Sequence, residues 1–139
     1  MIAQILPSSF SGTIIAPASK SASHRALICA ALSDKPCKIY GLTYSDDINA
    51  TLSVLEAFGA EYKRESDALI ITPCKRNIKD VTVCCNESGS TARFLLPVAA
   101  ALGANCVCTG EGRLPERPMN TLTTLLREHG VAVSQDNLP

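Results

Sequence analysis

The chain has 139 residues, 46% of them hydrophobic, which is the usual size of one domain and enough to bury a core. Lysine plus arginine and aspartate plus glutamate number 13 each, so the net charge favours neither nucleic acid nor an anionic membrane as a partner. No targeting signal is recognisable at the start, and the longest apolar run, Phe94 to Leu102, is too short to cross a bilayer. We therefore expect a soluble, cytoplasmic protein in which any basic site is a local cluster.

The first half of the chain predicts two helices and five strands. One helix is expected from about Ser21 to Ser33, and because it is apolar on every side from Ala26 to Leu32, other elements should enclose it. A second helix is expected between its N-cap Ser45 and the stop residue Gly59. The strands are expected at Ile2 to Leu6, Gly12 to Ala16, Cys37 to Leu42, Ala60 to Arg64 and Ala68 to Thr72.

The second half shows a similar pattern of elements. Strands are expected at Val81 to Cys85, Asn105 to Thr109 and Val131 to Val133. A helix is expected from Phe94 to Leu102, but Pro97 would cost roughly 3 kcal/mol inside it, so this helix should kink there or begin later. A last helix, stopped by Gly130, should bury one face that includes His129 as a core residue beside Met119, Leu122, Leu125 and Leu126.

The two halves also match one another in residue order. Arg25, for example, corresponds to Arg93, which lies 68 positions later. We infer a duplicated α/β block, with a first repeat at 12–79 and a second at 80–139. The second repeat stops before a closing strand like Ala68 to Thr72, so we expect the chain to be a truncated piece.

The segment from Ser19 to Arg25 has the composition of an anion-binding site. It places three serines, Lys20 and Arg25 at the start of an apolar helix, where unpaired N–H groups and the helix dipole attract an anion. With a helix that begins near Ser21, Ser21 and Arg25 share one face and Lys20 lies at the turn. The same residues also fit an N-cap serine followed by two solvated cations, and the segment alone does not decide between these interpretations.

Other groups give weaker indications of chemistry. The seven cysteines have no C-x-x-C spacing and only two histidines accompany them, so reduced, mostly buried thiols are favoured over a metal site. Asp46 and Asp47 stand in the first turn of a predicted helix, where carboxylates usually favour the helix dipole. We assign no metal or acid–base role to them.

Four segments, in order along the chain, resemble the signature of a known enzyme family. Ser19 to Leu27 matches the pattern S-K-S-x-S-[NH]-R-A-L. Three further family blocks are similar to Ser45–Asp47, to Ser88–Arg93, and to Gly110–Arg113 with Glu116–Met119. On these segments the chain is identified as a member of the 5-enolpyruvylshikimate-3-phosphate synthase family, over all of its length from about Gly12.

The resemblance implies both an activity and a fold. Members of this family transfer the enolpyruvyl group of phosphoenolpyruvate to the 5-hydroxyl of shikimate 3-phosphate, in aromatic amino-acid biosynthesis, without metal or organic cofactor. Their fold, an inside-out α/β barrel, has two domains, each built of three βαβαβ-type repeats around buried helices. This chain would then supply two repeats of one domain, while residues 1–11 would hold an initial strand of the other domain.

The resemblance also assigns roles to individual residues. Lys20 is implied to contact both substrates and to be the catalytic residue of this chain. Ser21 and Arg25 are implied to bind shikimate 3-phosphate, and Gly89 and Arg117 to bind phosphoenolpyruvate.

One position departs from the family pattern. Glu87 stands where the family usually has asparagine. A carboxylate beside the phosphoenolpyruvate residues would weaken anion binding unless it turns away or pairs with Arg93.

Two alternatives remain open at this point. A sister family moves the same enolpyruvyl group onto UDP-N-acetylglucosamine, but it has K-N at the first block and a reactive cysteine near the third, and residues 110–118 contain no cysteine. The other alternative is an isolated, non-catalytic anion-binding module, because a chain without the second domain cannot close over its substrates. We therefore expect this chain alone to be inactive and, with apolar surface uncovered, to self-associate, whereas the whole enzyme should be a monomer.

Overall fold

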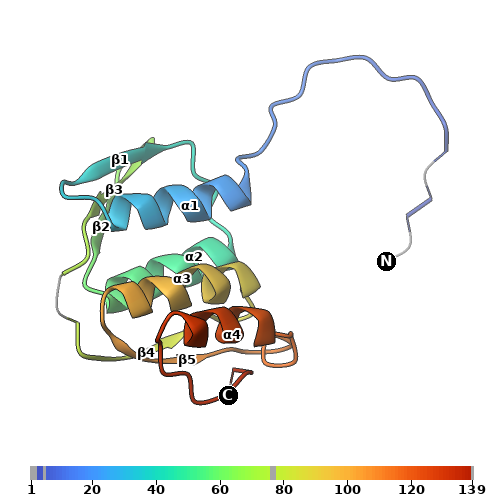
Figure 1. Ribbon diagram of the computed structural model, residues 1–139. Helices are drawn as coiled ribbons and strands as arrows, with labels where there is room; N and C mark the ends of the chain where they lie inside the picture. Colours follow the sequence, from blue (N-terminus) through green and yellow to red (C-terminus); the bar gives the residue numbers. More distant parts are fainter. Residues whose placement is uncertain (1–2, 5, 76–77, 139) are drawn as a thin grey trace.

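The computed structural model describes residues 3–4, 6–75 and 78–138 and mixes helices with strands throughout (Figure 1). The helices are α1 (Lys20–Ala31), α2 (Asp46–Ala57), α3 (Gly89–Ala101) and α4 (Asn120–Glu128). The strands are β1 (Cys37–Tyr40), β2 (Glu61–Arg64), β3 (Ala68–Thr72), β4 (Asp80–Cys84) and β5 (Asn105–Thr109).

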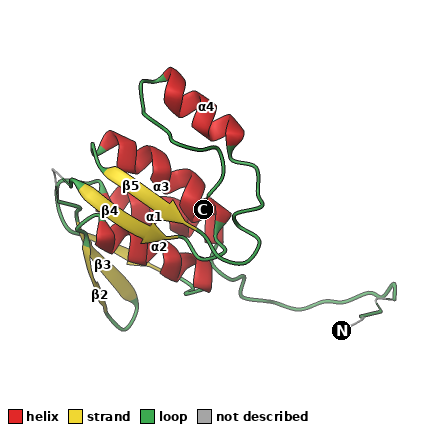
Figure 2. Cartoon of the chain, turned by 90° about the horizontal axis from the view of Figure 1, so that it is seen from below, coloured by secondary structure: helices red, strands yellow, loops and turns green. Residues whose placement is uncertain are grey.

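Three helices, α1 to α3, lie side by side in the middle of the molecule, and two sheets lie outside them (Figures 1 and 2). In one sheet β3 lies between β1 and β2 and is antiparallel to both, with Ile71 opposite Cys37 and Tyr62. In the other, β4 and β5 are parallel, with Asp80 opposite Asn105, and α3 forms the crossover between them. Helices inside and sheets outside confirm the fold class that the sequence predicts.

The core lies where these helices meet the sheets. Its largest fully buried apolar side chains are Leu27, Ile48, Leu52, Leu55, Phe58, Leu69, Ile71, Leu95 and Leu114. Each contributes about 1.5 to 3 kcal/mol by leaving water. The helix α1 is less enclosed than expected, because Cys29 and the C-cap residue Leu32 stay exposed.

The predicted helix caps are confirmed. Ser45 is the N-cap of α2, and its Oγ accepts a hydrogen bond from the N–H of Ile48 at 3.4 Å. Gly59 and Gly130 follow the ends of α2 and α4 with φ of 82° and 83°, a left-handed conformation that glycine adopts without steric cost.

The two strands predicted before α1 are not formed in the described residues. Gly12 to Ala16 are exposed, belong to no strand and extend away from the helices (Figure 1). The first predicted strand includes Ile2 and Ile5, which lie outside the described residues, and its described residues 3, 4 and 6 are not in a strand. Local sequence favoured strands here, but a strand also needs a neighbour for its backbone N–H and C=O groups, and the described residues provide none.

Two boundaries in the second half also differ from the prediction. Val131 to Val133 form no strand. The helix α3 begins earlier than predicted, at Gly89, because the Oγ of Ser88 caps it by accepting a hydrogen bond from the N–H of Thr91 at 3.2 Å. Pro97 therefore lies inside the helix, and the expectation of a later start was wrong.

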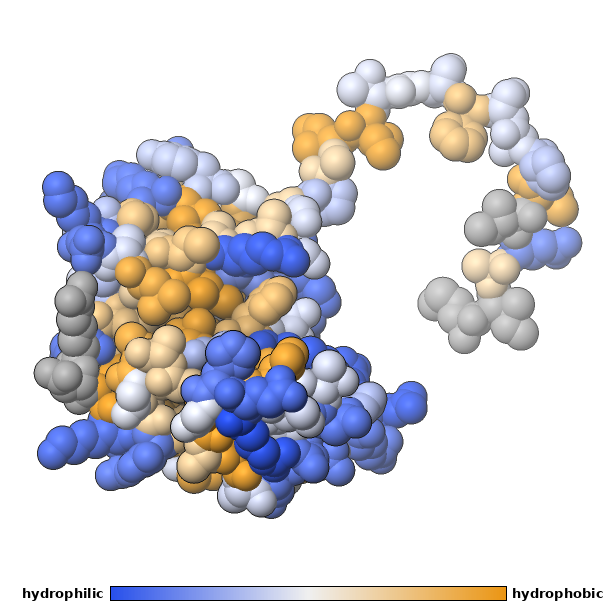
Figure 3. Space-filling view, viewed as in Figure 1, coloured by the Kyte–Doolittle hydropathy of each residue, from blue (hydrophilic) through white to orange (hydrophobic). Residues whose placement is uncertain are grey.

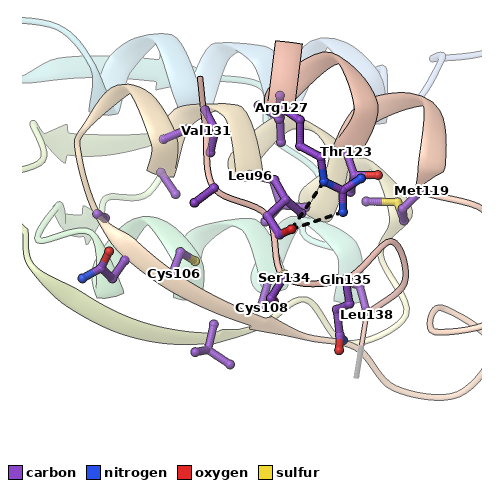
Figure 4. A pocket seen from close by; sticks show the side chains of 18 of the residues that line it. Leu96, Cys106, Cys108, Met119, Thr123, Arg127, Val131, Ser134, Gln135 and Leu138 are labelled. Carbon is purple, nitrogen blue, oxygen red and sulfur yellow. Dashed lines mark hydrogen bonds between the residues drawn. The ribbon is translucent and has the colours of Figure 1, made fainter. Parts of the chain in front are cut away.

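The last helix, α4, stands apart from the sheet instead of packing its whole apolar face into the core (Figure 2). An open cavity of about 1170 Å³ separates α4 and the segment after it from β4, β5 and α3 (Figure 4). Met119 is buried, but Leu125 is 48% exposed. His129 was predicted in the core and is exposed, with its Nδ1 2.8 Å from the carbonyl oxygen of Leu125. That prediction was wrong because periodicity identifies an apolar face without showing how closely it is covered.

The cysteines are less buried than expected. Cys85 and Cys108 are buried with their sulfur atoms 3.4 Å apart, Cys29 is exposed, and the other cysteines lie between these extremes. In residues 3–4, 6–75 and 78–138, no group of three or more His, Cys, Asp or Glu side chains is arranged to hold a metal ion.

The two sheets draw their strands from different predicted repeats, β1 to β3 from 12–79 and β4 and β5 from 80–139. The duplication itself stays a prediction. No helix in the described part of the chain combines the length and apolarity needed to span a membrane.

Candidate functional site

The first two turns of α1 present Lys20, Ser21 and Arg25 at one end of the helix layer. Ser19 is the N-cap, and its Oγ accepts a hydrogen bond from the N–H of Ala22 at 3.3 Å. Arg25 donates from Nη1 to the carbonyl oxygen of Ser21 at 2.9 Å, so these two residues share a face of the helix. All three predicted site residues are exposed and therefore open to a ligand from solution.

Lys20 reaches across to the first turn of α2. Its Nζ lies 2.5 Å from Oδ2 of Asp47, with side chains that are 55% and 28% exposed. The interpretation of Asp47 as a dipole residue alone was therefore incomplete. An ion pair this exposed adds only about 0 to 1 kcal/mol to stability, so its main effect is on where the ammonium group of Lys20 stands.

Arg25 leans from α1 toward α3. Its guanidinium carbon lies 5.2 Å from the centre of the Phe94 ring, over the face of the ring. A cation over an aromatic ring is attracted by about 0.5 to 1 kcal/mol at an exposed site. The contact holds the charge of Arg25 near the start of α3.

Two arginines converge on Gly89 in the first turn of α3. A Cβ atom at Gly89 would lie 2.6 Å from Nη1 of Arg93 and 3.0 Å from Nη1 of Arg117. Arg93 also donates to the carbonyl oxygens of Gly89, at 3.4 Å, and Pro118, at 3.1 Å, which ties the loop before α4 to α3. The missing Cβ of Gly89 is what lets both guanidinium groups approach the backbone.

Glu87 is directed at the loop before α4 and not at these arginines. Its Oε1 accepts a hydrogen bond from the N–H of Arg113 at 3.3 Å. The same oxygen would be 1.5 Å from a Cβ atom at Gly112, so glycine is required opposite it. Glu87 therefore turns away from the phosphoenolpyruvate residues and does not pair with Arg93.

The predicted site residues come from neighbouring helix starts and one loop. The helices α1, α2 and α3 run in the same direction, with their N-terminal ends at one edge of the molecule (Figure 1). Contacts of Asp47 with Lys20 and with Thr91 join the three starts. Three aligned dipoles place partial positive charge at this edge, Arg25 and Arg117 add full charges, and Lys20 adds a charge that Asp47 partly compensates. Such an arrangement attracts phosphate and carboxylate groups.

A chain of buried side chains beneath this edge was not predicted. Nδ1 of His24 lies 2.7 Å from Oγ1 of Thr51, which lies 2.8 Å from Oγ1 of Thr91. The single hydroxyl proton of Thr91 is shared between Oγ of Ser88, at 2.7 Å, and the carbonyl oxygen of Asp47, at 3.3 Å. His24, Thr51 and Thr91 are 0% exposed. Thr91 lies within the family segment Ser88–Arg93, but nothing in the local sequence marks Thr51 or indicates that helix packing brings the two threonines together.

His24 is neutral in this environment. Burial lowers its pKa from the usual 6.5, the Asp47 carboxylate opposes that shift, and the positive charges of Lys20 and Arg25 add to it. His24 therefore contributes hydrogen bonding, and not positive charge, to the edge where the three helices begin.

The cavity under α4 lies apart from these residues. It is lined by β4, β5, α3, α4 and residues 130–138, and none of the five predicted site residues takes part in it (Figure 4). Arg127, which lines it, is occupied by Oδ1 of Asp136 at 2.6 Å and by the carbonyl oxygen of Val133 at 3.2 Å. This cavity therefore offers no second cluster of available cations.

A family model described as EPSP synthase (3-phosphoshikimate 1-carboxyvinyltransferase) matches residues 6–138 of the chain. The chain belongs to the EPSP synthase family. The 3-phosphoshikimate 1-carboxyvinyltransferase of Clostridium botulinum strain Alaska E43 is 39% identical over 137 residues, which cover 94% of this chain and 32% of that protein. The enzyme of the same name from Clostridium beijerinckii is 40% identical over 139 residues, with the same two coverages. The chain thus spans about a third of the length of these EPSP synthase relatives.

Solved structures show the same fold. An EPSP synthase structure from Acinetobacter baumannii superposes with a TM-score of 0.79 and 23% sequence identity, over 92% of this chain and 30% of that one. A second structure of EPSP synthase from the same organism gives a TM-score of 0.74 at 23% identity. The prediction that this chain has part of the enolpyruvyl transferase fold is confirmed.

Proposed function

We propose that this chain supplies part of the substrate site of an enzyme that transfers the enolpyruvyl group of phosphoenolpyruvate to the 5-hydroxyl of shikimate 3-phosphate. The observation that supports the proposal is the gathering of Lys20, Arg25, Gly89 and Arg117 at the edge where three helices begin. Membership of the EPSP synthase family supports these two substrates for that anion site.

Each residue has a separate role in this proposal. Arg25 binds the phosphate of shikimate 3-phosphate with its planar, paired N–H donors, and Ser21 adds a hydroxyl on the same helix face. Gly89 and Arg117 bind phosphoenolpyruvate, where the bare glycine backbone allows close approach. Lys20 is the proposed catalytic residue, because its mobile ammonium group contacts both substrates.

The chemistry explains why cations predominate. A bond forms between the 5-oxygen of shikimate 3-phosphate and the second carbon of the enolpyruvyl group, the bond from that carbon to the phosphate oxygen breaks, and inorganic phosphate takes up the hydroxyl proton. Both substrates are anions and repel one another, so fixed positive groups are needed to bring them together. The same groups stabilise the charge that develops on the leaving phosphate. No cofactor or metal is part of this proposal.

This chain spans only about a third of its relatives, so we propose binding without turnover for the chain by itself. Closure over the substrates, which excludes water and completes such sites, depends on the rest of the enzyme. The alternative of an anion-binding module thus applies to the isolated chain. Transfer to UDP-N-acetylglucosamine is the weaker candidate, because residues 110–118 contain no cysteine.

Titration calorimetry of the chain with shikimate 3-phosphate tests the proposal at Arg25. We expect Arg25→Ala to weaken binding about tenfold, the lower end of a charge-assisted hydrogen bond, because solvent screens this exposed group. Lys35→Ala is the matched control, since Lys35 is an exposed cation beyond the opposite end of α1. Equal affinity of wild type and Arg25→Ala, or an equal loss in both variants, would refute the assignment, and phosphate release by the chain alone would refute binding without turnover.

The proposed phosphoenolpyruvate site can be tested at Arg117, with a second arginine of the same loop as the control. In the presence of shikimate 3-phosphate, we expect Arg117→Ala to weaken phosphoenolpyruvate binding by about tenfold or more. Arg113→Ala, on the same loop, should leave it unchanged, because the Arg113 side chain is exposed and its Nε lies 3.7 Å from Glu116. Titration of phosphoenolpyruvate into the three proteins measures this, and similar losses in both variants would count against a specific site.

A further inference from the structure

The contacts beneath the helix starts close into a ring that includes Lys20. Lys20 pairs with the carboxylate of Asp47, and the carbonyl oxygen of Asp47 accepts a hydrogen bond from Thr91. Thr91 contacts Thr51, and Thr51 contacts His24. His24 and Lys20 stand one turn apart in α1, so α1 supplies both ends of the ring. The ring connects the first turns of α1, α2 and α3.

The direction of the hydroxyl protons in this ring is inferred from the carbonyl oxygen of Asp47. Thr91 donates toward Oγ of Ser88 and toward the carbonyl oxygen of Asp47, which can only accept. The lone pairs of Thr91 then face Thr51, so the Thr51 hydroxyl is the donor across their 2.8 Å contact. Thr51 has no second proton to give, and Nδ1 of His24 must donate to it at 2.7 Å.

The other ring nitrogen of His24 agrees with this assignment. Nε2 is buried and has no hydrogen-bond partner within the described residues. The ring of Phe94 is inclined at 63° to that of His24, with 6.5 Å between the ring centres, and carries no nitrogen or oxygen acceptor. A hydrogen on Nε2 would be a buried donor without an acceptor, which folded proteins rarely contain. Nε2 therefore carries only its lone pair.

We propose that His24 is a positioning residue that, as the neutral Nδ1–H tautomer, locks Thr51 and Thr91 and so fixes the first turns of α1 and α3 relative to one another. The inference rests on the proposed function, because that function identifies the residues that are positioned. These residues are Lys20 and Arg25 in α1 and Gly89 in α3. His24 itself is fully buried and touches neither substrate.

Four variants separate this role from general packing. Thr51→Val removes the central hydroxyl and keeps the shape of the side chain. His24→Leu removes the donor, whereas His24→Asn restores one, because the amide nitrogen of asparagine can occupy the place of Nδ1. Thr123→Val is the matched control, since it removes a buried hydroxyl from α4 that donates to Asp136 at 2.7 Å, away from the ring.

The first measurement is the tautomer of His24 in the wild-type chain, by long-range nitrogen–proton NMR near neutral pH. The expected result is a protonated Nδ1 and an unprotonated Nε2. A protonated Nε2 would overturn the proposal, because Thr51 would then donate to His24 and the direction of the ring would reverse.

The second measurement is amide hydrogen exchange in the two helix starts, at the N–H groups of Ser23 and Thr91. We expect Thr51→Val and His24→Leu to accelerate hydrogen exchange at both N–H groups about tenfold, measured relative to the Leu55 amide in the core of α2. A tenfold change corresponds to about 1.4 kcal/mol, which is the size of one buried hydrogen bond. His24→Asn should restore most of the protection. If only one helix start responds, if asparagine does not rescue, or if Thr123→Val has the same effect, the positioning role is wrong.

The third measurement connects the ring to its proposed use. Thr51→Val should weaken binding of shikimate 3-phosphate and of phosphoenolpyruvate together, although it touches neither. A wild-type chain that binds neither substrate would refute the proposed function, while the tautomer and exchange results would still decide whether His24 couples the two helix starts.

Discussion

At the scale of single residues, the environment of His24 determines its charge and therefore its effect on stability. Burial disfavours the imidazolium form and holds the pKa of His24 below 6.5, and only the Asp47 carboxylate works against that shift. In the unfolded chain the same histidine is solvated and has its ordinary pKa. The two states thus bind different numbers of protons in mildly acidic solution.

This difference predicts how stability depends on pH. The folded pKa lies below the unfolded value, so the contribution of His24 is complete above 6.5 and is lost as the pH falls toward the folded pKa. The free energy of unfolding should therefore fall more between about pH 7.5 and about pH 5.5 in wild type than in His24→Asn, which has no imidazole to protonate. Urea titrations of both proteins at the two pH values measure this. Identical pH dependence would mean that His24 does not resist protonation in the folded chain.

Some residues of the site could be predicted from local sequence, whereas others could not. A helix start near Ser21 was predicted from local rules, and α1 begins one residue earlier, at Lys20, with Ser19 as its N-cap. The shared face of Ser21 and Arg25 follows from helical spacing. Thr51 and Thr91 follow from no such rule, because their importance arises only when two helices from distant parts of the chain pack together. The roles of Lys20, Ser21, Arg25, Gly89 and Arg117 toward substrates stay predictions.

At the scale of elements, α3 contains a proline in its interior, where proline normally disrupts a helix. Pro97 lies well inside the helix, which begins at Gly89, and leaves the carbonyl oxygen of Arg93 without its normal helical donor. The N-cap Ser88 and the buried Leu95 hold the helix in place in spite of this cost. Packing therefore outweighs a local rule here.

We predict that Pro97→Ala stabilises the chain. Alanine restores the missing helical hydrogen bond, while the unfolded chain gains freedom that proline denied it, so the expected net gain is about 1 to 2 kcal/mol in the free energy of unfolding. Denaturant unfolding of the variant and of wild type measures the gain. Ala100→Pro serves as the opposite control, since a second proline inside α3 should destabilise it. A loss of stability in Pro97→Ala would show that the proline ring packs better than its half-buried position indicates.

The elements that sequence predicts best are those with their own start and stop signals. The helix α2 is bounded by Ser45 and Gly59, and both signals act through the backbone nearby. The segment Gly12 to Ala16 has the composition of a strand, but pairing depends on a neighbour that no local pattern provides. The position of α4 likewise depends on how its face is covered, and the sequence of the helix does not contain that information.

At the scale of the whole molecule, apolar surface remains uncovered on one side. Apolar side chains gather over the helices between β1 and α4 in the view of Figure 3. Cys29 in α1 and Leu32, the C-cap of α1, are also exposed, the latter to 48%. Apolar patches of this kind favour association with another surface.

We therefore predict that the chain self-associates as its concentration rises. Sedimentation velocity over a wide range of concentrations should show the weight-average mass increase, and Leu32→Glu should reduce that increase, because a charge on the α1 surface opposes its burial. Thr82→Glu, an exposed position on β4, should leave association unchanged. A chain that stays monomeric at every concentration would show that the uncovered surface on α1 is tolerated in water.

The Lys20–Asp47 pair has a consequence for recognition. Lys20 already has a counter-ion within the protein, the carboxylate of Asp47 in the neighbouring helix α2. Because this carboxylate is tethered close to Lys20, every anion from solution has to compete with it. Weakly charged or badly placed solutes lose that competition, whereas a doubly charged phosphoryl group held by other contacts as well can win it. Selectivity at this edge can therefore come from an anion that the protein itself provides.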